Sequence, residues 1–256
     1  MQIYVINLER SLDRRQSMQA QFEKNELEAN FYKAVNGSTL DEKWKSRTCS
    51  DGYNKLMGNP GFSVNNEIAC FASHFCLWNL CIEKNENFII LEDDIGIKPD
   101  FKARLPTIEK LVNHLGYLRL MALEHKDGFF SVSDELICYK HFPCGTQGYA
   151  ISPSGAAKLI SNAARWTEPV DMYLDKFWIH GLRPYCINPE LITHLEEVKS
   201  LISENGARKS QYLSKPKGIL KLLRELIIRP YQKHKMKSFE LKNPLITKAK
   251  VQEWLK

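Results

Sequence analysis

The chain has 256 residues, a length that fits one large domain or one domain with a small appendage. Its seven cysteines are odd in number and include no Cys-x-x-Cys pair, which argues against a disulfide framework and a zinc ribbon. The net charge of +6 is unevenly distributed along the chain. Residues 215–256 carry 12 basic and 3 acidic side chains, whereas residues 1–214 carry 24 basic and 27 acidic ones. No apolar stretch approaches the roughly 20 residues that a membrane-spanning helix needs.

The N-terminal quarter is predicted to hold two strands around a helix. Residues 3–8 are expected to form a buried strand rather than a signal peptide, and an amphipathic helix carrying Met18 and Phe22 follows a basic turn. Such a turn suits phosphate, because helix N-termini attract anions. Residues 31–35 are predicted as a second strand and the polar segment 37–61 as an irregular loop, whose length suggests a function.

The middle of the chain alternates between helical and extended patterns. We expect helices over residues 65–81, 100–114, 153–164 and 170–179, and strands over 88–92, 117–123, 136–139, 148–152 and 185–187. This alternation indicates an α/β fold with a mostly parallel sheet flanked by helices.

The most informative segment is the strand predicted at Phe88–Leu91, which is followed without a break by Glu92, Asp93 and Asp94. Its unbroken apolar run is typical of a strand buried on both faces. Three carboxylates at the end of such a strand are costly unless a cation neutralises them. Mg²⁺ or Mn²⁺ prefers oxygen ligands and keeps positions open for phosphate oxygens. The segment therefore predicts a metal-assisted site for a phosphorylated ligand, with a solvated acidic loop as the alternative.

The basic C-terminal part is predicted to be a helical extension, residues 215–256, beside a main domain of residues 1–214. Residues 218–228 combine leucines and isoleucines with lysines and arginines, a pattern that favours a short basic amphipathic helix. This helix either binds an anionic membrane surface or docks on the main domain. We expect no nucleic-acid binding, because the extension has too few aromatic residues for base stacking.

Five segments occur in the expected order over about residues 1–200. They are Val5-Ile6-Asn7-Leu8 with Arg10, Asp13 and Arg14 or Arg15, Asn66-Glu67-Ile68-Ala69-Cys70 with Ser73-His74, Leu91-Glu92-Asp93-Asp94, Gly145-Thr146-Gln147-Gly148-Tyr149 with Ser152, and Pro169-Val170-Asp171. Together they resemble glycosyltransferase family 25, which includes lipooligosaccharide galactosyltransferases of Gram-negative bacteria and collagen galactosyltransferases. Asn66 stands where the family's glycine is expected, and asparagine tolerates similar turns.

The resemblance implies a GT-A-like domain that binds a UDP-sugar, usually with Mn²⁺, and inverts the sugar carbon. The expected function is transfer of a hexose, galactose above all, from UDP-galactose or UDP-glucose to a lipooligosaccharide or lipopolysaccharide acceptor. We expect a cytoplasmic protein, peripheral on the inner face of the inner membrane, that contacts the membrane through its basic extension.

The resemblance also assigns roles to particular residues. Mn²⁺ or Mg²⁺ is expected on Asp94, on Glu92 directly or through water, and on the late histidine His194. Donor-binding residues are expected at Asn7, Arg10, Arg15, Ser73, His74, Asp93, Gln147, Gly148 and Tyr149. Of these, His74 and Tyr149 are alternatively core residues. Arg15, with its neighbour Arg14, alternatively lies on a solvated helix face.

An inverting transfer needs a general base opposite the leaving diphosphate. Asp171 is preferred because it lies in a matching segment, although it is alternatively only a helix cap. Asp175 lies four residues further on the same predicted helix face, and Glu124 follows the strand predicted at 117–123.

Two other classes of function share some of these features. Another metal-dependent nucleotide-processing enzyme, such as a nucleotidyltransferase or phosphohydrolase, would use the same acidic strand end, but neither a phosphate loop nor a second carboxylate cluster is evident. A non-catalytic polyanion-binding module would use only the basic extension.

Overall fold

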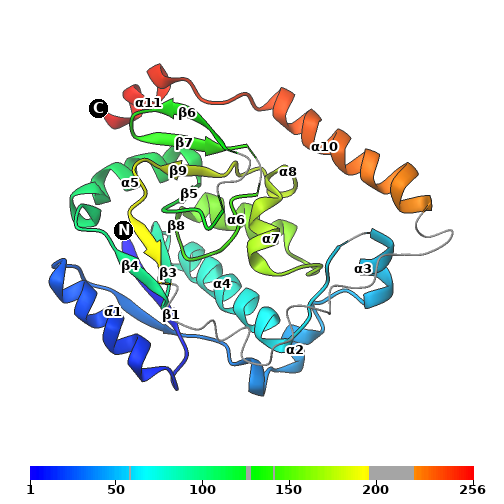
Figure 1. Ribbon diagram of the computed structural model, residues 1–256, viewed down its shortest axis with the longest axis horizontal. Helices are drawn as coiled ribbons and strands as arrows, with labels where there is room; N and C mark the ends of the chain where they lie inside the picture. Colours follow the sequence, from blue (N-terminus) through cyan, green and yellow to red (C-terminus); the bar gives the residue numbers. More distant parts are fainter. Residues whose placement is uncertain (58, 125–127, 141, 196–221) are drawn as a thin grey trace.

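The computed structural model describes residues 1–57, 59–124, 128–140, 142–195 and 222–256 (Figure 1). Within these residues the chain forms an eight-stranded sheet in the order β2-β1-β3-β8-β5-β9-β7-β6, and a two-stranded sheet of β4 and β10. The strands are β1 (Gln2–Asn7), β2 (Asn30–Lys33), β3 (Phe88–Glu92), β4 (Ile95–Ile97), β5 (Tyr117–Arg119), β6 (Phe129–Ser133), β7 (Leu136–Tyr139), β8 (Gly148–Ile151), β9 (Tyr185–Ile187) and β10 (Ile192–His194).

The large sheet is mixed, but most of its strands share one direction. β1 is parallel to β2 and β3, and β9 is parallel to β5. β8 is antiparallel to β3 and β5, and β7 is antiparallel to β9 and β6. Only β8 and β7 among these eight strands therefore run against the others. The expected α/β fold with a mostly parallel mixed sheet is confirmed, and it is consistent with a GT-A-like domain.

Helices cover both faces of the sheet. In chain order the helical segments are α1 (Leu12–Lys24), η1 (Gly37–Thr39), α2 (Glu42–Lys45), α3 (Asp51–Met57), α4 (Asn65–Lys84), α5 (Phe101–Leu115), α6 (Pro153–Asn162), α7 (Val170–Asp175), α8 (Phe177–His180), η3 (Arg224–Ile228), α10 (Arg229–Lys242) and α11 (Lys248–Leu255). α1, α5 and α11 contribute to the core on one face, and α4, α6 and α7 to the core on the other.

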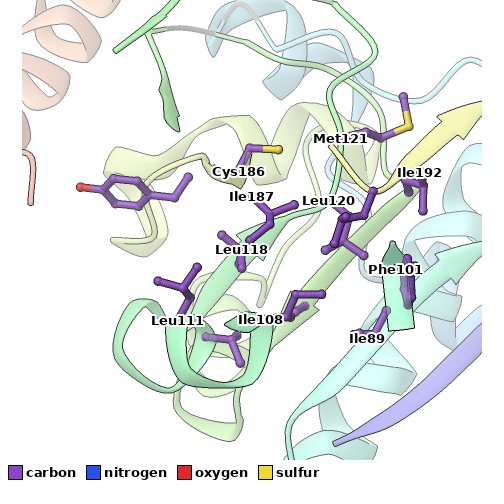
Figure 2. Close-up of a cluster of buried hydrophobic side chains, with 14 of the residues drawn as sticks. Ile89, Phe101, Ile108, Leu111, Leu118, Leu120, Met121, Cys186, Ile187 and Ile192 are labelled. Carbon is purple, nitrogen blue, oxygen red and sulfur yellow. The ribbon is translucent and has the colours of Figure 1, made fainter. Parts of the chain in front are cut away.

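The apolar run of β3 is explained by these two cores. Ile89 and Leu91 pack on the α1 and α5 side, and Phe88 and Ile90 pack on the α4 side, because successive side chains of a strand point to opposite faces. All four are fully buried. Figure 2 shows the first cluster, in which Ile89 lies near Phe101. Burial on both faces removes the polar alternation that a half-exposed strand would show.

Several elements differ from the expectation. The segment 37–61 is not simply irregular, because it contains η1, α2 and α3. The side chains of Asn36 and Asp41 cap the first two of these, and such short helices carry no readable apolar period. The helix expected over 170–179 is divided at Lys176 into α7 and α8. The short strands β4, β6 and β10 were not expected.

The C-terminal part is divided between a docked helix and an exposed one. α11 packs against α5 and β6, with Val251 fully buried and Trp254 stacked on His114 at 4.5 Å between ring centroids. α10 runs along the outer edge of the molecule, on the side opposite α1 (Figure 1). Of the helix expected at 218–228, residues 222–228 are helical, and residues 218–221 lie outside the described residues, as does the division expected between 214 and 215. No helix in the described ranges is both long and apolar enough to cross a membrane.

Candidate functional site

A pocket lies where β1 and β3 end, at the edge at which open α/β sheets collect ligands. Its wall is completed by α4, by the segment before β8, by the start of α7 and by the end of β10. The predicted site residues that line it are Ser73, His74, Glu92, Asp93, Asp94, Gln147, Asp171 and His194. The sheet thus brings together residues that are more than a hundred positions apart in the chain.

Glu92 is the last residue of β3 and lies beside a threonine hydroxyl and a histidine ring. The hydroxyl of Thr146 donates a short hydrogen bond to Glu92 Oε1, and His74 Nε2 lies 3.6 Å from the same oxygen. Burial alone raises the pKa of Glu92, but the approach of His74, the hydrogen bond from Thr146 and the proximity of His194 outweigh burial and lower that pKa. Glu92 is therefore kept as a carboxylate at the floor of the pocket.

Asp93 points towards β1 and α1. Its Oδ2 accepts a hydrogen bond from Asn7 Nδ2, and its Oδ1 accepts one from Arg14 Nη1, both at 2.8 Å. Arg14 was not among the expected site residues, although it lies four positions before Met18 on the buried face of α1. Arg14 thus neutralises the middle carboxylate of the acidic run and Asn7 adds a hydrogen bond to it. The expected contact of Asp93 with a ribose stays a prediction.

Asp94 and His194 both present an unpaired polar atom to the pocket. Asp94 Oδ1 and His194 Nδ1 are buried and have no hydrogen-bond partner among the described residues. The antiparallel pairing of β4 with β10 places His194 opposite Ile95, and the N–H of Leu195 donates to the backbone carbonyl of Asp94. Burial, followed by the charges of Glu92 and Asp93, raises the pKa of Asp94 to about 7, against the opposing effect of Arg14.

These two residues fit a divalent cation. A carboxylate oxygen and an imidazole nitrogen that lack partners are ligand atoms for such an ion, and a cation would offset both the burial and the neighbouring negative charges. Glu92, in contrast, lies in a different group. Among the described residues, one set of three His, Cys, Asp or Glu ligand atoms falls within 4.8 Å of one another, and it consists of Cys70, His74 and Glu92. The expected ligation by Glu92 alongside Asp94 and His194 stays a prediction.

Arg10, Arg15 and Ser73 also make contacts within the fold. Arg10 is exposed and donates to Asn36 Oδ1 at 3.3 Å. Arg15 lies over the ring of Phe31, 4.5 Å from its centroid. Ser73 donates its hydroxyl hydrogen to the carbonyl of Ala69 and accepts from the backbone N–H of Val35. Of these three, Ser73 lines the pocket.

Tyr149 and Gly148, on β8, lie behind the pocket wall. The Tyr149 hydroxyl accepts a hydrogen bond from Trp78 Nε1 and lies 2.8 Å from His74 Nδ1, and the residue is only 1% exposed. A Cβ added to Gly148 would approach Ile192 to 2.4 Å and Leu91 to 2.8 Å. Packing against these two side chains thus accounts for the glycine at this position.

The three candidate bases have different surroundings. Asp171 lines the pocket in the first turn of α7. Asp175 is buried, with its Oδ1 3.2 Å from Arg119 Nη1 and its Oδ2 accepting from the N–H of Cys144. Burial raises the pKa of Asp175 to about 6, although Arg119 opposes the shift. Glu124 is half-buried beside residues that the structure does not describe.

Arg119 organises the segment that carries Thr146 and Gln147. Besides pairing with Asp175, it donates to the backbone carbonyls of Cys144 and Gly145. Those two residues have positive φ angles of 54° and 74°. Arg119 on β5 therefore holds the turn at Cys144 and Gly145, and this turn places Thr146 against Glu92. Sequence reasoning missed Arg119, because an arginine inside an apolar strand gives no indication of which distant carboxylate it meets.

Comparisons with known proteins agree on one family. The family described as "Glycosyltransferase family 25 (LPS biosynthesis protein)" matches residues 1–174. A glycosyltransferase 25 family member of Aedes aegypti is 32% identical over 186 residues, which is 67% of this chain and 30% of that protein. Procollagen galactosyltransferase 2 of Mus musculus is 27% identical over 173 residues, 62% of this chain and 27% of that protein.

A longer match is found with procollagen galactosyltransferase 1-B of Xenopus laevis, which is 27% identical over 237 residues, 79% of this chain and 38% of that protein. The chain thus spans about a third of the length of these curated relatives. The matched region includes β1, α4 and β3, which build most of the pocket.

Proposed function

This chain belongs to glycosyltransferase family 25, and from that premise we propose that it transfers a hexose from a UDP-sugar to the oligosaccharide of a lipooligosaccharide or lipopolysaccharide. Galactose is the proposed sugar, because relatives with similar sequences are named galactosyltransferases. The family's description as LPS biosynthesis proteins supports the lipopolysaccharide acceptor. The names of the relatives supply the competing acceptor, procollagen.

The observation that supports this proposal most is the pair of unpartnered buried atoms, Asp94 Oδ1 and His194 Nδ1, at the edge of a sheet where nucleotide ligands collect. Asp94 and His194 would hold a Mn²⁺ or Mg²⁺ ion, with Glu92 as a direct or water-mediated third partner. Such an ion supplies Lewis-acid stabilisation of the departing diphosphate.

Asp171 is the proposed general base for inversion. It lines the same pocket as the proposed ion site and lies on a different wall, at the start of α7. A base there would take the proton from the attacking acceptor hydroxyl. Asp175 is less suited to this role, because Arg119 and the N–H of Cys144 occupy its two oxygens. Its contacts favour a role in holding the turn at Cys144.

The proposed location is the cytoplasmic face of the inner membrane, with α10 and η3 as the contact. Leu222, Leu226, Ile227 and Tyr231 are 54–66% exposed there, among basic side chains such as Arg224 and Arg229. Exposed apolar groups next to basic ones suit the interface of an anionic bilayer, where each basic residue contributes about 1 kcal/mol. A lipid-linked acceptor would be presented to the pocket from that surface.

The proposal is tested with purified protein, Mn²⁺ and separate UDP-galactose and UDP-glucose donors. We expect galactose to appear on lipooligosaccharide core acceptors, detected by mass spectrometry, with inverted configuration by NMR and with loss of activity in EDTA. Asp171→Asn is expected to lower kcat at least 100-fold, in the range of general-base catalysis, and to leave KM for the donor similar.

Two other outcomes of this assay would contradict the proposed function. Transfer to a procollagen peptide and not to the core oligosaccharide would contradict the proposed acceptor. Release of free phosphate or nucleotide transfer without sugar transfer would identify another nucleotide-processing enzyme.

A further inference from the structure

A second group of potential ligand atoms lies at the floor of the pocket, apart from Asp94 and His194. Cys70 and His74 are four residues apart on α4, so their side chains share one face of the helix. β3 brings Glu92 to the same place, and Cys70 Sγ, a His74 ring nitrogen and a Glu92 carboxylate oxygen all lie within 4.8 Å of one another. All three residues line the pocket.

His74 supplies an independent sign that this space takes a cation. The residue is 0% exposed, and its Nε2 has no hydrogen-bond partner among the described residues although it faces Glu92 Oε1 at 3.6 Å. Its Nδ1 lies 2.8 Å from the Tyr149 hydroxyl, which Trp78 fixes from the other side. When Nδ1–H donates to Tyr149, Nε2 turns a lone pair towards the Glu92 carboxylate. In that tautomer a cation between the two atoms removes their repulsion.

The surroundings of His74 also match those of a metal-binding histidine. Histidine ligands almost always donate their second ring nitrogen to a fixed acceptor, which orients the ring and raises its basicity. Tyr149 can act in this way, because its ring is buried in the core and its oxygen is held by Trp78. The hydroxyl of Thr146 meets Glu92 Oε1 and orients the carboxylate in the same manner.

We propose that Cys70, His74 and Glu92 bind one transition-metal ion of borderline-soft character, of which Zn²⁺ is the best fit. One thiolate, one imidazole and one carboxylate make a donor set that zinc accepts readily and that Mg²⁺ does not favour. With three protein ligands, a tetrahedral ion keeps its fourth position open towards the pocket. Binding forms a sulfur–metal bond and releases the Cys70 thiol proton to the solvent.

This site shares Glu92 with the proposed site for the sugar-nucleotide ion. An ion held by Cys70 and His74 draws Glu92 towards α4. Glu92 is then less available as a ligand for an ion at Asp94, so the two ions compete for it. Zinc is thus expected to antagonise manganese in this pocket. The site itself does not depend on sugar transfer, because its ligands and its test involve no nucleotide.

The test is a titration of the reduced full-length chain with Co²⁺, which occupies zinc sites and absorbs light. We expect a thiolate-to-cobalt charge-transfer band in the near ultraviolet that saturates at one equivalent and disappears when Zn²⁺ is added. Cys70→Ser is expected to abolish the band. Cys76→Ser is the matched control, since Cys76 lies on the same helix with similar partial exposure and does not line the pocket, and it is expected to keep the band.

A second variant covers the case in which Cys70→Ser does not fold. Glu92→Gln removes the carboxylate ligand and retains the thiolate, so the band should persist with at least about tenfold weaker Co²⁺ affinity. The proposal is overturned if the wild-type chain shows no saturable band, if folded Cys70→Ser retains it, if Cys76→Ser loses it, or if Glu92→Gln binds Co²⁺ as tightly as the wild type.

Discussion

Arg14 and Asp93 form an ion pair in the wall of the pocket, in which each side chain is only 10% exposed. Asn7 is the second donor to the same carboxylate. Removing the arginine would leave a buried carboxylate with a single neutral partner, which typically costs 3–5 kcal/mol. We therefore expect Arg14→Gln to lower the free energy of unfolding by about 3 kcal/mol in a urea titration followed by circular dichroism.

Arg15 provides the matched control for that experiment. It is the next residue of α1 and its guanidinium lies over the ring of Phe31, a contact worth at most about 1 kcal/mol at a partly exposed site. Equal losses in Arg14→Gln and Arg15→Gln would show that the ion pair with Asp93 does not stabilise the pocket wall.

His180 gives the fold a defined pH dependence. Burial lowers the pKa of His180 from 6.5 to about 4. Between these two values the unfolded chain binds more protons than the folded one, so stability falls as the pH decreases from 6.5 to 4. The shift corresponds to about 3 kcal/mol. In His180→Gln this part of the pH dependence should be absent in urea titrations performed at pH 4.5 and pH 7.

If stability changed with pH equally in His180→Gln and in the wild type, His180 would not be the source of this pH dependence. The expected effect is specific to this residue, because both ring nitrogens are used inside the fold: Nε2 lies 3.2 Å from the Leu174 carbonyl, and Nδ1 accepts from the N–H of Leu182.

Individual site residues were predictable only where local sequence carries the signal. The acidic run at the end of β3 predicted the charged end of the strand. A matching motif indicated Asp171 and the usual late position of a third ligand indicated His194, and both residues line the pocket. The pairing of Asp93 with Arg14 depends on the parallel alignment of β1 with β3, which is a contact between distant segments. Spacing alone could have indicated Arg14, since it shares the buried face of α1 with Met18.

At the scale of elements, the contact between α6 and the end of α5 leaves no room for a side chain. A Cβ on Gly155 would lie 1.9 Å from the carbonyl oxygen of Gly116, the residue with φ of +79° that ends α5. Because the obstacle is backbone, we expect Gly155→Ala to lower the free energy of unfolding by about 2 kcal/mol or more.

Gly52 in α3 is the control for this substitution. A Cβ there meets nothing within 4 Å, so Gly52→Ala should leave stability unchanged or raise it by up to about 1 kcal/mol through helix propensity. A Gly155→Ala protein as stable as the wild type would contradict the close approach of Gly155 to the Gly116 carbonyl.

The predictability of the elements follows their burial and length. β3, α4 and α5 carry long apolar patterns, and the structure confirms each of them within a few residues. The short helices between residues 37 and 57 depend on caps such as Asn36 and Asp41, and no apolar face of readable period supports them. β4 and β10 have three residues each and are defined by pairing with each other, which a local pattern does not reveal.

At the scale of the whole molecule, the C-terminal part is divided between a helix that belongs to the core and helical residues that are exposed. α11 belongs to the core, since Val251 is fully buried there and Lys110 Nζ donates to the backbone carbonyl of Leu255. Its few apolar residues gave little indication of docking in the sequence. Deleting residues 215–256 would therefore remove part of the core, and substitutions on η3 are the better test of membrane contact.

We expect the double substitution Leu226→Asp and Ile227→Asp to lower binding to anionic phospholipid vesicles at least tenfold in a sedimentation assay. Both side chains are at least 60% exposed on η3, so they are available to a bilayer and contribute little to the fold. Charged groups in their place remove apolar contact and repel anionic lipid.

Leu12→Asp is the control, because Leu12 is 62% exposed and starts α1 on the other side of the molecule (Figure 1). It should bind vesicles as the wild type does. Equal vesicle binding by the double variant and by the wild type would remove η3 from the proposed membrane contact.

The proposed function requires the pocket to hold a nucleotide diphosphate with a divalent ion through Asp94. Isothermal titration of UDP into the protein, with and without Mn²⁺, tests it directly in the wild type and in Asp94→Asn. We predict that Mn²⁺ tightens UDP binding at least tenfold in the wild type and has no such effect in Asp94→Asn, whose fold is checked by circular dichroism. UDP binding that is indifferent to Mn²⁺ in the wild type, or equally enhanced by Mn²⁺ in the variant, would contradict the claim.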